Sequence, residues 1–306
     1  MNEKKARNEK RTVPLWHVVL AAGGASLYDM YDFTVYGYCA PYIATNFFPQ
    51  GGGNINLALL ESFATYSAAF FMRPVGAAYF GYVGDMHGKR RALIQSTLLM
   101  AIPSFFMGFL PTYKQVGTPA TLLLVLLRMM QGIAVGGQLS GAYIIMVETA
   151  PVNRRAYYGS MITAANSIGS TCGSAVVTLL TLPLSQSQMN SWGWRIPFIL
   201  GSLFGPFGLI VLRLVPNQPT ITSHCSTKIA KNNNVLERLR SIVWGSERSR
   251  LYIMTGCLAG TAGAAYFKVW MLSYLATLTT IMSYHKASLI STCTLALEIL
   301  LFPCFG

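Results

Sequence analysis

The stretch GYVGDMHGKRRAL, Gly81 to Leu93, places an acid, a histidine and three consecutive basic residues in one short turn. Long apolar runs lie on both sides of this turn. A chain that gathers its charges in short turns between apolar segments is typical of a polytopic membrane protein. The turn therefore indicates an all-α fold in which helices cross a bilayer.

The composition agrees with a membrane protein. The 306 residues are 53% hydrophobic and 11% charged, whereas soluble domains contain about a quarter charged residues. The net charge of +13 suits nucleic acid only if the basic residues share one exposed face with aromatics between them. Here they come in small bursts between apolar runs. We therefore expect the lipid bilayer, and no nucleic acid, as the partner.

Apolar windows define the expected spans, because a bilayer core of about 30 Å needs roughly 20 mostly apolar residues per helix. The sequence predicts seven full spans and an eighth that ends with the chain. They cover residues 17–47, 61–83, 92–110, 120–147, 157–183, 196–215, 251–282 and 287–306.

Lysine and arginine alternate between rich and poor connecting segments along the whole chain. Cytoplasmic loops collect these residues, so we predict a multi-pass protein of the cell membrane with a cytoplasmic N-terminus. The expected organisation is a cytoplasmic tail (1–16), a six-span bundle (17–215), a central cytoplasmic loop (216–250) and a partial second bundle (251–306).

Two acids lie inside the first predicted span. Asp29 and Asp32 are three residues apart in LYDMYDF, so both carboxylates face one side of the helix. Two close acids in a low dielectric do not both ionise easily, and such a pair can load and release a proton. The alternative is that one or both form an ion pair with Arg73 or Arg128 and hold the bundle together.

Three cations lie inside other predicted spans. Arg73 and Arg128 can each hold a substrate carboxylate, which a planar guanidinium matches with two hydrogen bonds. An internal ion pair, or a side chain that reaches toward the interface, is the other interpretation. Lys268 and Tyr266 form a cationic and aromatic wall that suits a small polar solute, although aromatics also gather in membrane belts.

Enzymatic chemistry leaves no signature in the sequence. Six cysteines are scattered without CxxC spacing, which predicts no metal site. No nucleophile and base pair or phosphate-binding loop is present. We therefore expect no enzymatic activity.

The opening turn resembles the signature GxxxDxxGRKxxL of the major facilitator superfamily, between its second and third spans. Further stretches are similar to the metabolite:proton symporter family, which includes α-ketoglutarate permeases, citrate carriers and proline/betaine transporters. They are YDFTVYGYCAPYIATNFFP, FMRPVGAAYFGYVGD, RMMQGIAVGGQLSGAYIIMVETAP, RRAYYGS and SWGWRIPFILG, between residues 28 and 201. The resemblance implies a secondary transporter that moves a small organic acid or zwitterion with protons as the coupling ion and without a cofactor.

The resemblance also assigns roles to residues. The family's first span commonly reads FEWYDF, so Asp29 replaces the glutamate and Asp32 matches the aspartate. Gln138 stands where the family has the glutamate of GGE, which places it among the substrate-binding candidates. The implied cytoplasmic gate comprises Gly81, Asp85, Gly88, Lys89, Arg90, Arg91, Glu148, Arg154 and Arg155.

The length departs from the family pattern. Members have twelve spans in two halves with the substrate between them, whereas eight are predicted here. The expected fold is thus a six-helix N-terminal bundle of the major facilitator type plus about two helices of the second bundle. The alternative function is a truncated, non-transporting remnant, or an accessory subunit that needs a second chain to complete the bundle.

Overall fold

The computed structural model describes residues 15–48, 55–203, 249, 286 and 289–296, and the regular elements among them are all helical. The α-helices are α2 (Leu15–Phe47), α3 (Ile55–His87), α4 (Lys89–Gly108), α5 (Tyr113–Val116), α6 (Thr118–Thr149), α7 (Arg155–Leu180) and α8 (Gln186–Ser191). Two 3₁₀ turns, η2 (Val152–Arg154) and η3 (Gly193–Arg195), precede α7 and a helical segment at 196–203. Residues 289–296 are also helical.

The five long helices contain most of the first five predicted spans, and the segment at 196–203 begins where the sixth was predicted. The predicted seventh span (251–282) lies outside the described residues. So does the predicted central loop (216–250), apart from residue 249. Of the predicted eighth span, residues 289–296 are described as helix.

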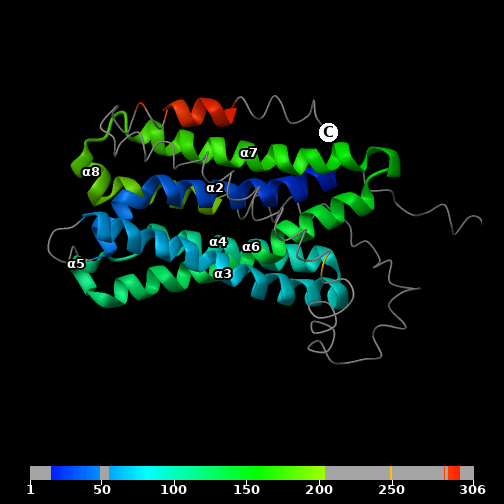
Figure 1. Ribbon diagram of the computed structural model, residues 1–306, viewed down its shortest axis with the longest axis horizontal. Coiled ribbons are helices and arrows are strands. Elements are labelled where there is room, and N and C mark those ends of the chain that lie inside the picture. Colours follow the sequence, from blue (N-terminus) through cyan, green and yellow to red (C-terminus); the bar gives the residue numbers. More distant parts are fainter. Residues whose placement is uncertain (1–14, 49–54, 204–248, 250–285, 287–288, 297–306) are drawn as a thin grey trace, which may run out of the picture.

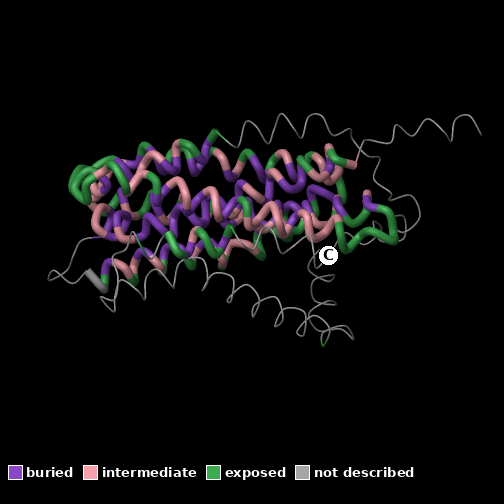
Figure 2. Tube along the Cα trace, turned by 90° about the horizontal axis from the view of Figure 1, so that it is seen from above, coloured by how far each residue is buried: buried purple, intermediate pink, exposed green. Residues whose placement is uncertain are grey.

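Helix α2 lies at the centre of the bundle. It packs against α7 on one side and against α3 and α6 on the other, while α4 packs against α6 and α3 (Figure 1). Every residue from 31 to 40 of α2 is buried. Figure 2 shows buried positions along the length of the bundle interior and exposed ones gathered near its ends. The polar side chains of α2 are therefore held in the middle of the protein.

Glycines let the helices approach closely. A β-carbon added to Gly132 or Gly136 of α6 would lie 2.1 Å from the carbonyl oxygen of Ala69 or Arg73 on α3. Spacing of small residues by four is a common way to bring membrane helices into backbone contact. The backbone of α3 thus rests on this face of α6, which fixes α6 against the rest of the bundle.

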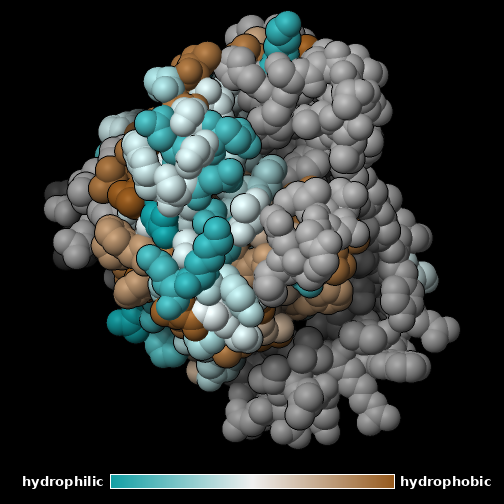
Figure 3. Space-filling model, turned by 90° about the vertical axis from the view of Figure 1, so that its left-hand side faces the viewer, coloured by the Kyte–Doolittle hydropathy of each residue, from teal (hydrophilic) through white to brown (hydrophobic). Residues whose placement is uncertain are grey.

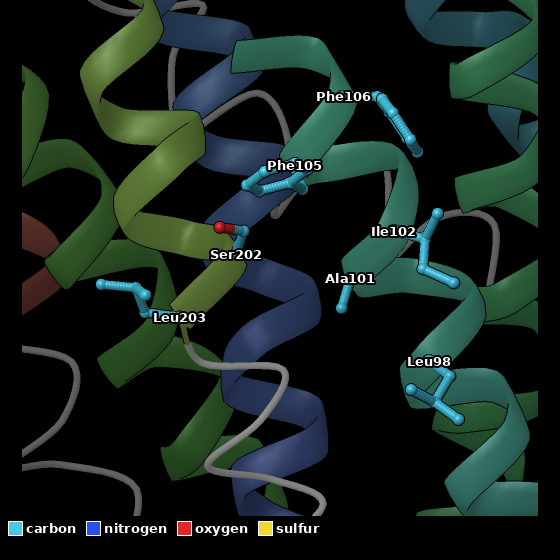
Figure 4. Close-up of a pocket in the computed structure, with 7 residues that line it drawn as sticks. All are labelled: Leu98, Ala101, Ile102, Phe105, Phe106, Ser202 and Leu203. Carbon is cyan, nitrogen blue, oxygen red and sulfur yellow. The ribbon is translucent and has the colours of Figure 1, made fainter. Parts of the chain in front are cut away.

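The outer surface is apolar, and the mainly apolar interior also holds buried polar and charged side chains, among them Asp29, Asp32 and Arg128. Helix α4 exposes a row of large apolar side chains: Leu98, Ile102, Phe105, Phe106 and Phe109. An open apolar groove of about 390 Å³ lies between α4 and Ser202 and Leu203 (Figure 4). By length and composition alone, α6 is the one helix of the described chain that qualifies as a membrane span. The exposed apolar row on α4 adds to the apolar outer surface beside α6.

Candidate functional site

The centre of the bundle holds a buried ion pair between α2 and α6. Arg128 Nη1 donates a hydrogen bond to Asp32 Oδ2 at 2.9 Å. The side chains are 0% and 2% exposed. The guanidinium carbon lies 3.7 Å from the centroid of the Tyr36 ring, a distance at which the ring face attracts a cation. The Arg128 guanidinium of α6 therefore contacts two side chains of α2, Asp32 and Tyr36.

Two neutral side chains complete the environment of Asp32. Ser104 Oγ of α4 donates to Asp32 Oδ1 at 2.6 Å. Gln131 Nε2 donates to the same oxygen at 3.1 Å and to Ser104 Oγ at 2.7 Å. All of these side chains are buried. The network joins α2, α4 and α6 through a single carboxylate.

Sequence reasoning missed Ser104 and Gln131. Gln131 lies three residues after Arg128 in an otherwise apolar segment, and this spacing puts both on one face of the helix. That signal could have found Gln131. Ser104 had no such signal, because serine is common in membrane helices and its partner comes from another span.

Asp29 lies one turn before Asp32 and differs from it in its contacts. It is fully buried, and neither carboxylate oxygen accepts a hydrogen bond from the described residues. Arg73 and Asp32 are the charged groups that act on it electrostatically. The Arg73 guanidinium carbon lies 4.2 Å from the ring centroid of Phe70 and 4.8 Å from that of Phe33. The two acids therefore have unequal surroundings: within the described residues Asp32 is paired and hydrogen bonded, and Asp29 is neither.

Gln138 of α6 is buried against α2. Its Nε2 donates to the carbonyl of Ala25 at 2.7 Å, one turn before Asp29. Its Oε1 accepts no hydrogen bond from the described residues. The side chain ties α6 to α2, and its assignment to substrate stays a prediction. Lys268 and Tyr266 lie outside the described residues.

The charged turn lies at the end of the bundle where α3 meets α4. Gly88 has a backbone φ of +95°, a conformation that residues with a β-carbon rarely adopt. The ammonium of Lys89 forms an ion pair with the carboxylate of Glu148 near the end of α6. Gly81, Asp85, Arg91, Arg154 and Arg155 are exposed, and Arg90 is half-buried. The structure thus pairs two of the predicted gate residues, Lys89 and Glu148, and the gating role itself stays a prediction.

The architecture defines a class. Long helices with an apolar exterior, charged side chains buried between them and glycine-mediated contacts are typical of an integral, multi-pass membrane protein. The sequence family described as "Sugar (and other) transporter" matches residues 17–282. The chain therefore belongs to that family, which confirms the resemblance carried by the turn at Gly81–Leu93.

Curated relatives agree with this assignment. A putative proline/betaine transporter of Staphylococcus aureus is 35% identical over 241 residues, which are 78% of this chain and 50% of the relative. The α-ketoglutarate permease of Escherichia coli is 32% identical over 292 residues, 95% of this chain and 65% of the relative. The chain thus spans about half to two thirds of the length of these relatives.

Solved structures show the same fold. A D-xylose–proton symporter superposes with a TM-score of 0.69 at 18% identity, over 93% of this chain and 66% of the other. A partially occluded, inward-open xylose transporter from E. coli gives a TM-score of 0.68 at 19% identity, over 94% and 69%. The predicted partial bundle of the major facilitator type is confirmed.

Proposed function

We propose that the protein is a secondary active transporter that moves a small carboxylate or zwitterion together with protons. The observation that carries the proposal is the buried pair of Asp32 and Arg128, because it couples a titratable acid to a side chain that recognises carboxylates. Asp29, one turn away, supplies a second acid in the same low-dielectric surroundings.

The coupling follows from the contacts of Arg128. One nitrogen, Nη1, is engaged by Asp32, whereas Nε and Nη2 donate no hydrogen bond to the described residues. A proton on Asp32 removes the negative charge that holds the guanidinium and leaves it available to a substrate carboxylate. A deprotonated Asp32 keeps Nη1 engaged and offsets the positive charge that would attract a substrate carboxylate. Proton binding and substrate binding therefore favour each other, as symport requires.

Asp29 provides a place for the proton on its way to Asp32. Its carboxylate has no hydrogen bond to break among the described residues, so gaining or losing a proton there disturbs no contact of the network. An isolated buried carboxylate is also costly when charged, which favours exchange of its proton over permanent ionisation.

The substrate class follows from the same guanidinium. Proline, betaine and α-ketoglutarate, the compounds in the names of relatives, share a carboxylate, which Arg128 suits. The alternating loop charges support a cytoplasmic N-terminus, with the turn at Gly81–Leu93 on that side and the protein in the cell membrane.

The test is uptake by the purified chain in liposomes. An inward proton gradient is imposed, and accumulation of labelled proline, glycine betaine and α-ketoglutarate is followed with and without a protonophore. The proposal predicts accumulation of at least one solute that the protonophore abolishes. Uptake no faster than in protein-free liposomes, for all three, would contradict it.

A further inference from the structure

A second pocket lies at the end of the bundle opposite the charged turn, away from the Asp32–Arg128 pair. It is an open, shallow hollow with a volume of about 380 Å³. Its lining comes from the end of α2, the start of α3, α5 and the start of α6: Phe48, Glu61, Ala64, Tyr113, Thr118 and Thr121. Figure 3 views the bundle from this end, where hydrophilic and hydrophobic surfaces lie side by side.

Glu61 is the one charged residue of this lining. It is half-buried, and it forms no ion pair with the described residues. The described cations of this end are engaged or turned to solvent. Arg195 donates to the carbonyls of Ser191 and Leu110, and Lys114 is exposed. The pocket therefore offers a negative charge that no described side chain neutralises.

Two aromatic rings accompany this carboxylate. Phe48 is 7% exposed, and Tyr113 is half-buried at the start of α5. Tyr113 is held in place because α5 begins with a reciprocal cap, in which the Thr112 backbone N–H donates to Gln115 Oε1 at 2.9 Å. A carboxylate and aromatic rings that line one pocket are the residue types that recognise ammonium groups, including quaternary ones.

We propose that the pocket lined by Glu61, Phe48 and Tyr113 is a binding site for the ammonium group of a small organic cation or zwitterion. An anion is disfavoured there, because Glu61 would face it without a described cation between them. The site gives the protein a means of selecting solutes at one end of the bundle by their positive group. In the proposed function, Arg128 at the centre of the bundle binds the carboxylate of the solute. The selecting role rests on the proposed function, whereas the binding itself does not.

The test is direct binding of choline to the purified chain in lipid nanodiscs, measured by titration calorimetry. The neutral isostere 3,3-dimethylbutan-1-ol has the same shape without the charge and serves as the matched ligand. We expect saturable choline binding and no comparable binding of the alcohol. Equal binding of the two ligands, or no saturable choline binding, would overturn the proposal.

Variants then locate the site. Glu61→Gln is expected to weaken choline binding about threefold to fivefold, the size of one partly exposed charge contact. The matched control Glu148→Gln, at the opposite end, should leave it unchanged. Tyr113→Leu should weaken binding several-fold and Tyr113→Phe should preserve it, because phenylalanine keeps the ring. A Glu61→Gln variant that folds like the wild type and binds choline equally well would overturn the assignment. If that variant does not fold, the comparison of Tyr113→Leu with Tyr113→Phe tests the site instead: equal choline binding by these two variants would overturn the assignment.

Asp32→Asn separates this proposal from the proposed function. That variant should lose proton-driven uptake and keep choline binding. Absence of uptake in the wild type would defeat the transport proposal and leave choline binding dependent on Glu61. Choline binding that is lost in Asp32→Asn and kept in Glu61→Gln would place the cation at the centre and overturn the outer site.

Discussion

Arg128 and Asp32 form a fully buried ion pair between α6 and α2, with 2.9 Å between Nη1 and Oδ2. Burying two charges costs several kcal/mol per ion, and well-packed apolar residues of similar volume often stabilise a protein as well or better. Stability alone therefore does not explain the pair. Its position next to Asp29 and its spare guanidinium donors fit a role in coupling a proton to a carboxylate.

Breaking one side of this pair should destabilise the protein strongly. Arg128→Leu leaves the Asp32 carboxylate buried without its cation, and we expect a loss of about 3–5 kcal/mol in the free energy of unfolding. The double variant Asp32→Leu with Arg128→Leu should recover most of that loss. Denaturant unfolding in detergent, followed by tryptophan fluorescence, measures both. A double variant as unstable as the sum of the single ones would show that the two residues do not act as a pair.

The hydroxyl of Ser104 should matter more than an ordinary helical serine. It donates to Asp32 at 2.6 Å inside the bundle, and a hydrogen bond to a charged group contributes about 1.5–3 kcal/mol. Ser104→Ala should lower the free energy of unfolding by that amount. Ser67→Ala is the matched control, because Ser67 donates to its own helix at an exposed position. Equal effects of the two substitutions would contradict the network around Asp32.

Close packing of α6 on α3 predicts a sharp difference between two glycines of α6. Gly132→Ala places a β-carbon about 2.1 Å from the Ala69 carbonyl oxygen and must push the helices apart, at a cost of about 1–3 kcal/mol or more. Gly141→Ala meets nothing within 4 Å and should be neutral or slightly stabilising. Thermal unfolding of the two purified variants measures the difference, and a Gly132→Ala variant that melts like the wild type would rule out the backbone contact.

The pair at the charged turn should behave unlike the central one. The Lys89 and Glu148 side chains are 30% and 46% exposed, and exposed ion pairs contribute about 0–1 kcal/mol. Glu148→Gln should therefore change the free energy of unfolding by less than about 1 kcal/mol, with the difference shrinking in high salt. The exchanged double variant Lys89→Glu with Glu148→Lys should match the wild type. A loss of unfolding free energy in Glu148→Gln as large as that in Arg128→Leu would contradict this, because it would show that the Lys89–Glu148 pair contributes strongly to stability.

Most of the fold could be predicted from the sequence, because the bilayer fixes helix length and loop charge fixes the alternation of the spans. The turn at Gly81–Leu93 resembles the superfamily signature, and five further stretches between residues 28 and 201 narrowed the resemblance to one family. Helix ends were predicted less well: α3 begins at Ile55 rather than near 61, so the largely apolar residues 55–60 belong to the helix although the predicted span left them out.

The site was only partly predictable. The charges of Asp29, Asp32, Arg73 and Arg128 stood out because ionisable residues are rare in spans. Which acid meets which cation depends on how α2, α4 and α6 rotate against one another, and one sequence does not contain that information. The structure shows that Asp32 pairs with Arg128 and that Asp29 has no hydrogen-bond partner in the described part of the chain.

The measurement that bears most directly on coupling through Asp32 is proton-driven accumulation in liposomes that contain the wild type or Asp32→Asn. Asparagine keeps the shape of the side chain and removes the titratable charge. We expect accumulation of a labelled carboxylate under an inward proton gradient to be abolished in Asp32→Asn, while its membrane insertion remains intact. Normal accumulation in that variant would contradict the account.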